Sequence, residues 1–147
     1  SDIVAEITEN FEPLAMSKGK QLTKEITEGL TCMAEKEKLG QLVSLLLDNA
    51  LKYASEKGEI KVILAPAKKG VRSSLTVWNT VGEESGIQAG NQDILFERFY
   101  RTDSSRNSGT GGSGIGLSVV KAIVERYGGK ITAKSEDGKS IAFQVVI

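Results

Sequence analysis

Residues 109–117 read GTGGSGIGL and run directly into SVVKAIVERYGG at 118–129. Five of the first eight residues in this stretch are glycine, and each glycine weakens a regular element by roughly 0.5–1 kcal/mol relative to alanine. The apolar residues that follow recur with a helical period, which predicts a helix over residues 115–127. Glycines in front of a helix leave backbone N–H groups open at its positive end, where a phosphate can bind. A glycine-rich surface loop is the alternative interpretation.

Two other phosphate-binding motifs do not fit this glycine cluster. GTGGSG is a formal match to G-x-G-x-x-G, and Glu136 and Asp137 lie about 20 residues downstream, where a dinucleotide fold keeps its ribose-binding carboxylate. That loop, however, leaves the end of a buried strand, whereas residues 101–108 read RTDSSRNS and are polar. A P-loop ends in Gly-Lys-Ser/Thr, but here Ile115 and Leu117 follow the last glycines.

The composition restricts the class of protein. The 147 residues suit one domain, and 39% apolar with 26% charged residues is typical of a folded globular chain. The 19 basic and 19 acidic side chains cancel, so we expect no nucleic-acid partner and no contact with a membrane. The single cysteine, Cys32, suits the reducing cytoplasm. The chain has no histidine, which excludes serine–histidine triads and histidine general bases.

Hydrophobic periodicity predicts the remaining elements. Helical spacing predicts three further helices, over residues 1–18, 34–54 and 93–99. Alternation predicts five strands, at residues 20–27, 59–66, 71–79, 131–135 and 140–147. The second and third strands should form one hairpin and the last two another, while residues 82–92 form a loop. We therefore predict an α/β two-layer sandwich, with a mixed sheet on one side and helices on the other.

An asparagine interrupts the apolar helix LVSLLLDNALKYA at residues 42–54. Asparagine is a poor helix former and is costly to bury without a partner. Helical spacing puts Asn49, Lys52 and Tyr53 in one strip at the edge of the apolar face. An amide oxygen suits Mg²⁺ that already carries phosphate oxygens, a lysine suits those phosphates, and a flat ring suits a base or its sugar. A helix-edge asparagine with a local hydrogen bond is the alternative.

Two arginines precede the glycine cluster in LFERFYR, residues 95–101. The guanidinium groups of Arg98 and Arg101 can bind phosphate oxygens in a bidentate manner. The alternative is a surface helix with salt bridges, anchored in the core by Phe96 and Phe99.

Together these stretches resemble the ATP-binding catalytic domain of bacterial sensor histidine kinases, in the Bergerat-fold superfamily shared with gyrase, Hsp90 and MutL. LLLDNALKY (45–53) resembles the N box of that family, LFERFYR the F box, and GGSGIGLSVVKAIVERYGGKI (111–131) the G2 box and the helix after it. The order and spacing of the three blocks also agree, from about residue 34 to the C-terminus. The resemblance implies a mixed, mostly antiparallel sheet packed on three helices.

The resemblance also implies a role for each matching position. Asn49 would ligate Mg²⁺, Lys52 would contact phosphate and Tyr53 would flank the nucleotide. Arg98 and Arg101 would steady the γ-phosphoryl group, with residues 102–113 as a lid over bound ATP. The lid and the start of the next helix would bring backbone close to the triphosphate at Gly112, Gly114, Ile115, Gly116 and Leu117.

Two departures from the family pattern change what we expect. Leu45 occupies the position where related ATPases carry a water-activating glutamate, so rapid ATP hydrolysis is not expected. In the G1 box, expected as Asp-x-Gly-x-Gly, Asn79 replaces the aspartate that accepts a hydrogen bond from adenine, and Val81 replaces the first glycine. Strand alternation still puts Asn79 on the same face as Leu75 and Val77, so its amide can point inward.

A histidine kinase phosphorylates a histidine on a helical hairpin, and this chain contains no histidine. The resemblance therefore implies one catalytic domain over residues 1–147, with residues 1–18 as the tail of a helix from an absent dimerisation and phosphoacceptor domain. A response regulator would be the further partner, and the protein would be a cytoplasmic part of a sensor. A nucleotide-binding regulatory module without transfer activity is the main alternative, and an anti-sigma-type serine kinase is the other.

Overall fold

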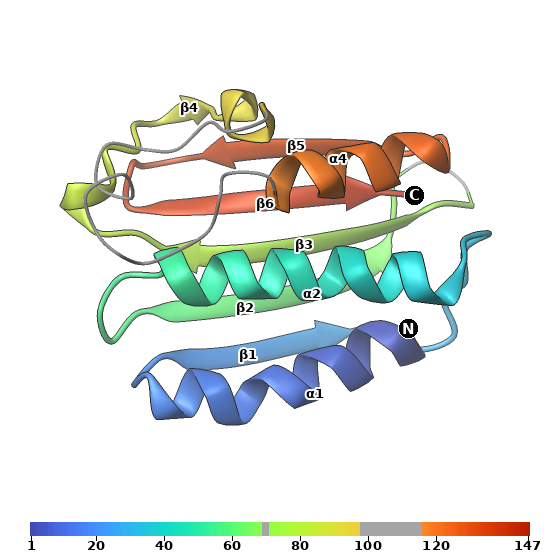
Figure 1. Ribbon diagram of the computed structural model, residues 1–147, viewed down its shortest axis with the longest axis horizontal. Coiled ribbons are helices and arrows are strands. Elements are labelled where there is room, and N and C mark those ends of the chain that lie inside the picture. Colours follow the sequence, from blue (N-terminus) through green and yellow to red (C-terminus); the bar gives the residue numbers. More distant parts are fainter. Residues whose placement is uncertain (69–70, 98–115) are drawn as a thin grey trace.

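The structure, a computed structural model, describes residues 1–68, 71–97 and 116–147. Within these ranges, three helices lie on one face of a six-stranded sheet and form a two-layer sandwich (Figure 1). The helices are α1 (Asp2–Ser17), α2 (Lys36–Tyr53) and α4 (Gly116–Arg126). The strands are β1 (Gln21–Ile26), β2 (Glu59–Pro66), β3 (Ser73–Thr80), β4 (Gly90–Asn91), β5 (Lys130–Ser135) and β6 (Ser140–Val146). Two short 3₁₀ helices, η1 (Glu83–Ser85) and η2 (Asp93–Phe96), complete the described elements.

The sheet is mixed, as predicted, and its strand order is β1-β2-β3-β6-β5-β4. Among the described strands, β1 and β2 form the only parallel pair; the other pairs are antiparallel and include both predicted hairpins. The parallel pair is possible because α2 carries the chain back between the two strands.

The predicted elements agree with the structure in most places. α2 is slightly shorter than the predicted 34–54, and Gly19 and Gly128 end α1 and α4 with φ values of +68° and +71°. The prediction of a plain loop over 82–92 was wrong, because this segment contains η1 and β4. The two residues of β4 pair with the edge of β5, and the Asp93 carboxylate accepts the Ala133 N–H at 2.9 Å. The predicted helix at 93–99 is a 3₁₀ turn as far as Phe96, and its last two residues lie outside the described part.

The core lies between the sheet and the helices. Its largest fully buried side chains include Phe143 of β6, Ile60 of β2, and three leucines of α2, Leu42, Leu46 and Leu47. Along β3 burial alternates strictly, so every second side chain faces the helices: Ser73, Leu75, Val77 and Asn79. The last of these brings an amide to the buried end of the strand.

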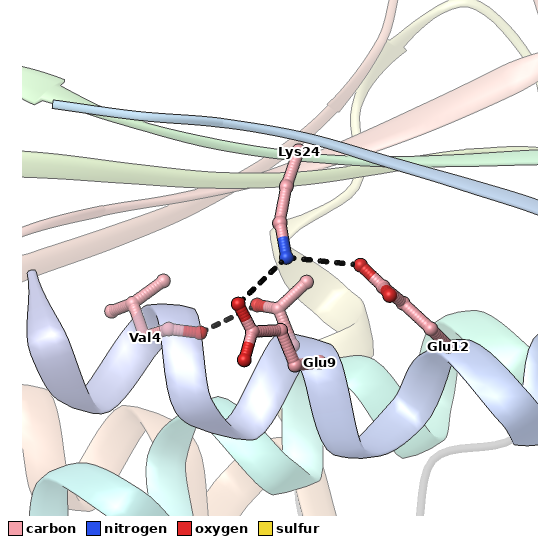
Figure 2. A network of polar contacts seen from close by, with 5 residues as sticks. Val4, Glu9, Glu12 and Lys24 are labelled. Atoms are coloured by element: carbon pink, nitrogen blue, oxygen red, sulfur yellow. Dashed lines mark hydrogen bonds and ion pairs between the residues drawn. The ribbon is translucent and has the colours of Figure 1, made fainter.

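A charged contact fastens α1 to the edge strand β1 (Figure 2). Lys24 faces the helix layer, and its Nζ lies 3.1 Å from one carboxylate oxygen of Glu9 and 3.1 Å from one of Glu12. The hydrogen bond to Glu12, followed in size of effect by the hydrogen bond to Glu9, raises the pKa of Lys24. Beside them the buried Thr8 hydroxyl donates to the Val4 carbonyl at 2.6 Å. α1 also packs against both α2 and β1, so it is an integral part of the helix layer.

Candidate functional site

The sequence-predicted site residues within the described ranges gather at one end of the molecule. Figure 1 shows the C-terminal ends of α2 and β3 at this end, with the start of α4 nearer the middle of the molecule. The Ser55 N–H donates to the Thr80 carbonyl at 3.0 Å, which joins the end of α2 to the end of β3. A Cβ atom added at Gly116 would lie 3.8 Å from Leu45 Cδ2, so the start of α4 lies against α2 one turn before Asn49. Segments distant in the sequence thus converge here.

Asn49 is half-buried near the end of α2, at the edge of the apolar face as predicted. Its side chain makes no hydrogen bond with any residue that the structure describes, so the local hydrogen bond of the alternative interpretation is not seen there. A half-buried amide without a partner is free to ligate a metal ion or to bind a polar ligand.

Lys52 and Tyr53 follow on the same strip. Lys52 Nζ lies 3.0 Å from Asp48 Oδ2, and the two side chains are 31% and 51% exposed. A pair this exposed contributes at most about 1 kcal/mol, so the ammonium can exchange its carboxylate for a phosphate at little cost. Tyr53 is half-buried at the last residue of α2.

Asn79 at the end of β3 carries the most informative polar group of the site. The residue is 0% exposed, and its Nδ2 donates to the Thr80 carbonyl at 2.9 Å. This bond fixes the amide orientation, since only the NH₂ group can face a carbonyl oxygen. Asn79 Oδ1 is then buried and lacks a partner, the only such side-chain atom in the described ranges. An unsatisfied buried acceptor costs roughly 1–3 kcal/mol, which a ligand carrying an N–H donor would recover.

The two departures from the family pattern are both visible. Val81 is buried in place of the expected glycine, and its N–H donates to the Lys139 carbonyl at 2.8 Å. Leu45 is half-buried against the core and has no group that could polarise a water molecule.

Of the remaining candidate residues, the structure describes only those from residue 116 onward. Gly116 is exposed at the first residue of α4, and Leu117 is half-buried beside it. The other predicted site residues, and the lid at 102–113, lie outside the described residues: Arg98, Arg101, Gly112, Gly114 and Ile115.

Sequence reasoning missed a polar network beside Asn79. Thr80 Oγ1 accepts a hydrogen bond from Ser55 Oγ at 2.7 Å and another from the Glu59 N–H at 3.1 Å. Gly58 packs under this network, because an added Cβ would collide with Thr80 Oγ1 and lie 2.6 Å from the Ser55 carbonyl oxygen. The glycine a few residues after the helix was the available signal in the sequence, because only a residue without a Cβ atom fits so close to Thr80 and Ser55.

The described residues hold no preformed metal cluster. No group of three or more histidine, cysteine, aspartate or glutamate side chains in the described ranges could hold a metal ion. A hard cation at Asn49 would therefore need further oxygen ligands from a bound phosphate. An apolar hollow of about 430 Å³ lies at the opposite end of the molecule, between the starts of α1 and α2. Its walls include Leu39, Leu42 and Leu64, which do not suit a triphosphate.

Comparisons with known proteins show the family of the chain. The model of the family described as histidine kinase-, DNA gyrase B-, and HSP90-like ATPase matches residues 34–147. The probable sensor protein PcoS of Escherichia coli is 38% identical over 140 residues, which are 95% of this chain and 28% of PcoS. The chain spans about a quarter of the length of the curated relatives it matches.

Solved structures share the fold. The catalytic domain of histidine kinase ThkA superposes with a TM-score of 0.76 at 24% identity, covering 99% of this chain and 90% of that one. Full-length ShkA in complex with AMPPNP gives a TM-score of 0.77 at 23% identity, covering 99% of this chain and 29% of ShkA. Within the described ranges, no helix is long and apolar enough to cross a membrane.

Proposed function

Because the chain belongs to the family of histidine kinase-, DNA gyrase B- and HSP90-like ATPases, we propose that it is the ATP-binding catalytic domain of a sensor histidine kinase. It binds ATP with Mg²⁺ and transfers the γ-phosphoryl group to a histidine on a separate helical hairpin. Several curated relatives are named as sensor histidine kinases or signal transduction histidine-protein kinases, which supports this choice over other members of the family. The acceptor must lie elsewhere, since these 147 residues include no histidine.

The observation that carries the proposal is the unpartnered Oδ1 of Asn79. The exocyclic amine of adenine is a donor of the kind this oxygen lacks, and an aspartate at this position binds it in the family. An amide accepts that bond without charge assistance, at a loss we place at about 1 kcal/mol. ATP therefore binds with micromolar to millimolar affinity, and the preference for adenine is retained but softened.

Residues on α2 and around the start of α4 bind the triphosphate end of the nucleotide. Asn49 ligates Mg²⁺ together with phosphate oxygens, Lys52 exchanges Asp48 for a phosphate, and Tyr53 flanks the nucleotide. Arg98 and Arg101 hold the γ-phosphoryl group. The backbone of the lid and of the first turn of α4 approaches the phosphates at Gly112, Gly114, Ile115, Gly116 and Leu117.

Phosphoryl transfer needs mainly positioning and charge neutralisation, so the domain requires no base of its own. Leu45 cannot activate water, which keeps ATP hydrolysis slow. The bound γ-phosphoryl group then persists until a histidine acceptor arrives.

The partners follow from the same proposal. Residues 1–147 act as one catalytic domain, and residues 1–18 lead to the dimerisation and phosphoacceptor domain. A response regulator receives the phosphoryl group from that domain, and the catalytic domain lies on the cytoplasmic side of the sensor.

Calorimetric titration with ATP, with and without Mg²⁺, tests the binding step. Asn49→Ala should abolish the effect of Mg²⁺ on affinity, whereas Gln41→Ala, an exposed change on the same helix, should leave it intact. Absence of ATP binding by the unchanged chain would refute the proposal.

Labelled ATP and a matching hairpin domain test the transfer step. Acid-labile phosphate on the hairpin supports a histidine kinase. ATP binding without transfer would favour a regulatory module, which the altered G1 box (Asn79 and Val81) makes the leading alternative, and acid-stable phosphoserine would indicate a serine kinase.

A further inference from the structure

The connection between α1 and β1 brings a lysine against the end of α2. Gly19 turns the chain with a φ of +68°, and the Lys20 N–H donates to the Ala15 carbonyl at 2.9 Å. From there Lys20 Nζ donates to the carbonyl of Leu51 at 2.5 Å. The last backbone bond of α2 runs from the Ala54 N–H to the Ala50 carbonyl, so Leu51 has one of the terminal carbonyls that the helix leaves without a partner.

Lys20 is an unusual cation for this position. It is half-buried and forms no ion pair with any carboxylate in the described ranges. Burial lowers the pKa of Lys20, and the neighbouring charge of Lys18 lowers it further. An ammonium is strongly hydrated, so partial burial against a lone carbonyl is unfavourable unless the surrounding potential is negative.

The end of α2 supplies that negative potential. A helix carries roughly half a negative elementary charge at its C-terminus, spread over the unpaired carbonyls. The residues that we propose on the nucleotide, Asn49, Lys52 and Tyr53, lie in the last turns of this same helix. A triphosphate would therefore approach the helix pole of its own sign. Lys52 offsets little of this in the ligand-free chain, because Asp48 cancels its charge.

We propose that Lys20 is a positioning residue for the nucleotide site. It acts through the Leu51 carbonyl by neutralising the negative pole of α2, without touching the nucleotide. This inference rests on the proposed function, and it adds a cation from the connection between α1 and β1 to those predicted from the sequence.

Four variants of the 147-residue chain separate charge from structure. Lys20→Met keeps much of the aliphatic stem but removes both charge and donor. Lys20→Gln keeps a donor without the charge, and Lys20→Arg keeps both. Lys18→Met is the matched control, since Lys18 is exposed on the same connection and forms no ion pair in the described ranges.

The dissociation constants for Mg·ATP and for uncharged adenosine are measured by calorimetry and by NMR titration at low ionic strength. Lys20→Met and Lys20→Gln should weaken ATP binding about two- to five-fold, the range expected for one charge at a helix end. Adenosine binding should not change, and Lys20→Arg and Lys18→Met should match the parent chain. Raising the salt concentration should reduce the difference.

Two results would overturn the inference: unchanged ATP affinity in Lys20→Gln, or an equal loss for ATP and adenosine, which would indicate a structural role alone. If Lys20→Met fails to fold, Lys20→Gln and Lys20→Arg still distinguish charge from packing. A parent chain that does not bind ATP would refute the proposed function itself. A parent chain that binds ATP beside an unaffected variant would refute only the role of Lys20.

Discussion

Replacing Asn79 by aspartate changes the side chain whose Oδ1 atom carries the proposed function. In the present chain Nδ2 donates to the Thr80 carbonyl at 2.9 Å, and Oδ1 is buried without a partner in the described part of the structure. A carboxylate in this place would direct an oxygen at the carbonyl with no proton between them. The ligand-free domain can avoid this repulsion only by keeping the new carboxyl protonated.

The size of the effect follows from the burial of the position. A fully buried carboxyl beside an acceptor has its pKa raised well above the ordinary value of about 3.9, and a rise of about 2 units corresponds to about 2.7 kcal/mol. The folded state then binds the proton more tightly than the unfolded state. The penalty is therefore absent below about pH 4, grows between about pH 4 and pH 6, and is complete at neutral pH.

Bound ATP should favour the carboxylate over the amide at position 79. The exocyclic amine would give the carboxylate a charge-assisted hydrogen bond, about 1 kcal/mol stronger than the bond to the amide, which corresponds to about five-fold tighter binding. Urea unfolding at pH 4 and pH 7.5, together with calorimetric titration of ATP at pH 7.5, measures both effects.

Asn79→Leu provides the matched control. It removes the unpartnered oxygen, while the Thr80 carbonyl keeps its bond from the Ser55 N–H. The control should be at least as stable as the parent chain and should bind ATP much more weakly. Unchanged or weaker ATP affinity in Asn79→Asp, or an aspartate penalty that does not depend on pH, would refute this account of the site.

Three further predictions concern other parts of the chain. Gly58→Ala should lower the free energy of unfolding by about 1–3 kcal/mol in urea titrations, because the added methyl group has no room under Thr80 and Ser55. Gly40 lies inside α2, and Gly40→Ala should instead raise the free energy of unfolding by about 0.5–1 kcal/mol, because the added Cβ would make an ordinary 3.5 Å contact with Ile7 Cδ1. A lower free energy of unfolding in this variant would contradict the packing. The Asp137 carboxylate accepts the Lys139 N–H at 2.8 Å, which lowers the pKa of Asp137 below 3.8, so its stabilisation is present above about pH 4 and disappears as the pH falls through the folded-state pKa. Asp137→Asn should therefore lower the midpoint of urea unfolding at pH 7 but not in strong acid, and an equal effect at both pH values would exclude this origin.

The sequence by itself determined the elements and the faces that their residues occupy. Burial along β3 alternates as predicted, which made the inward orientation of Asn79 readable from Leu75 and Val77. The helical period in the same way placed Asn49 at the edge of the apolar face of α2. Both periods are set by local backbone geometry over a few residues, so no knowledge of distant segments is needed to apply them.

Only the tertiary structure decided which groups find partners. Asn79 Oδ1 is buried and has no hydrogen-bond partner in the described ranges, and no pattern within the strand encodes that. Lys20 and Leu51 are 31 residues apart in the chain, and the two-residue strand β4 exists only because the edge of β5 lies beside it. Hydrogen bonds between distant segments depend on how whole elements pack in three dimensions, whereas periodicity records only which side of an element is buried.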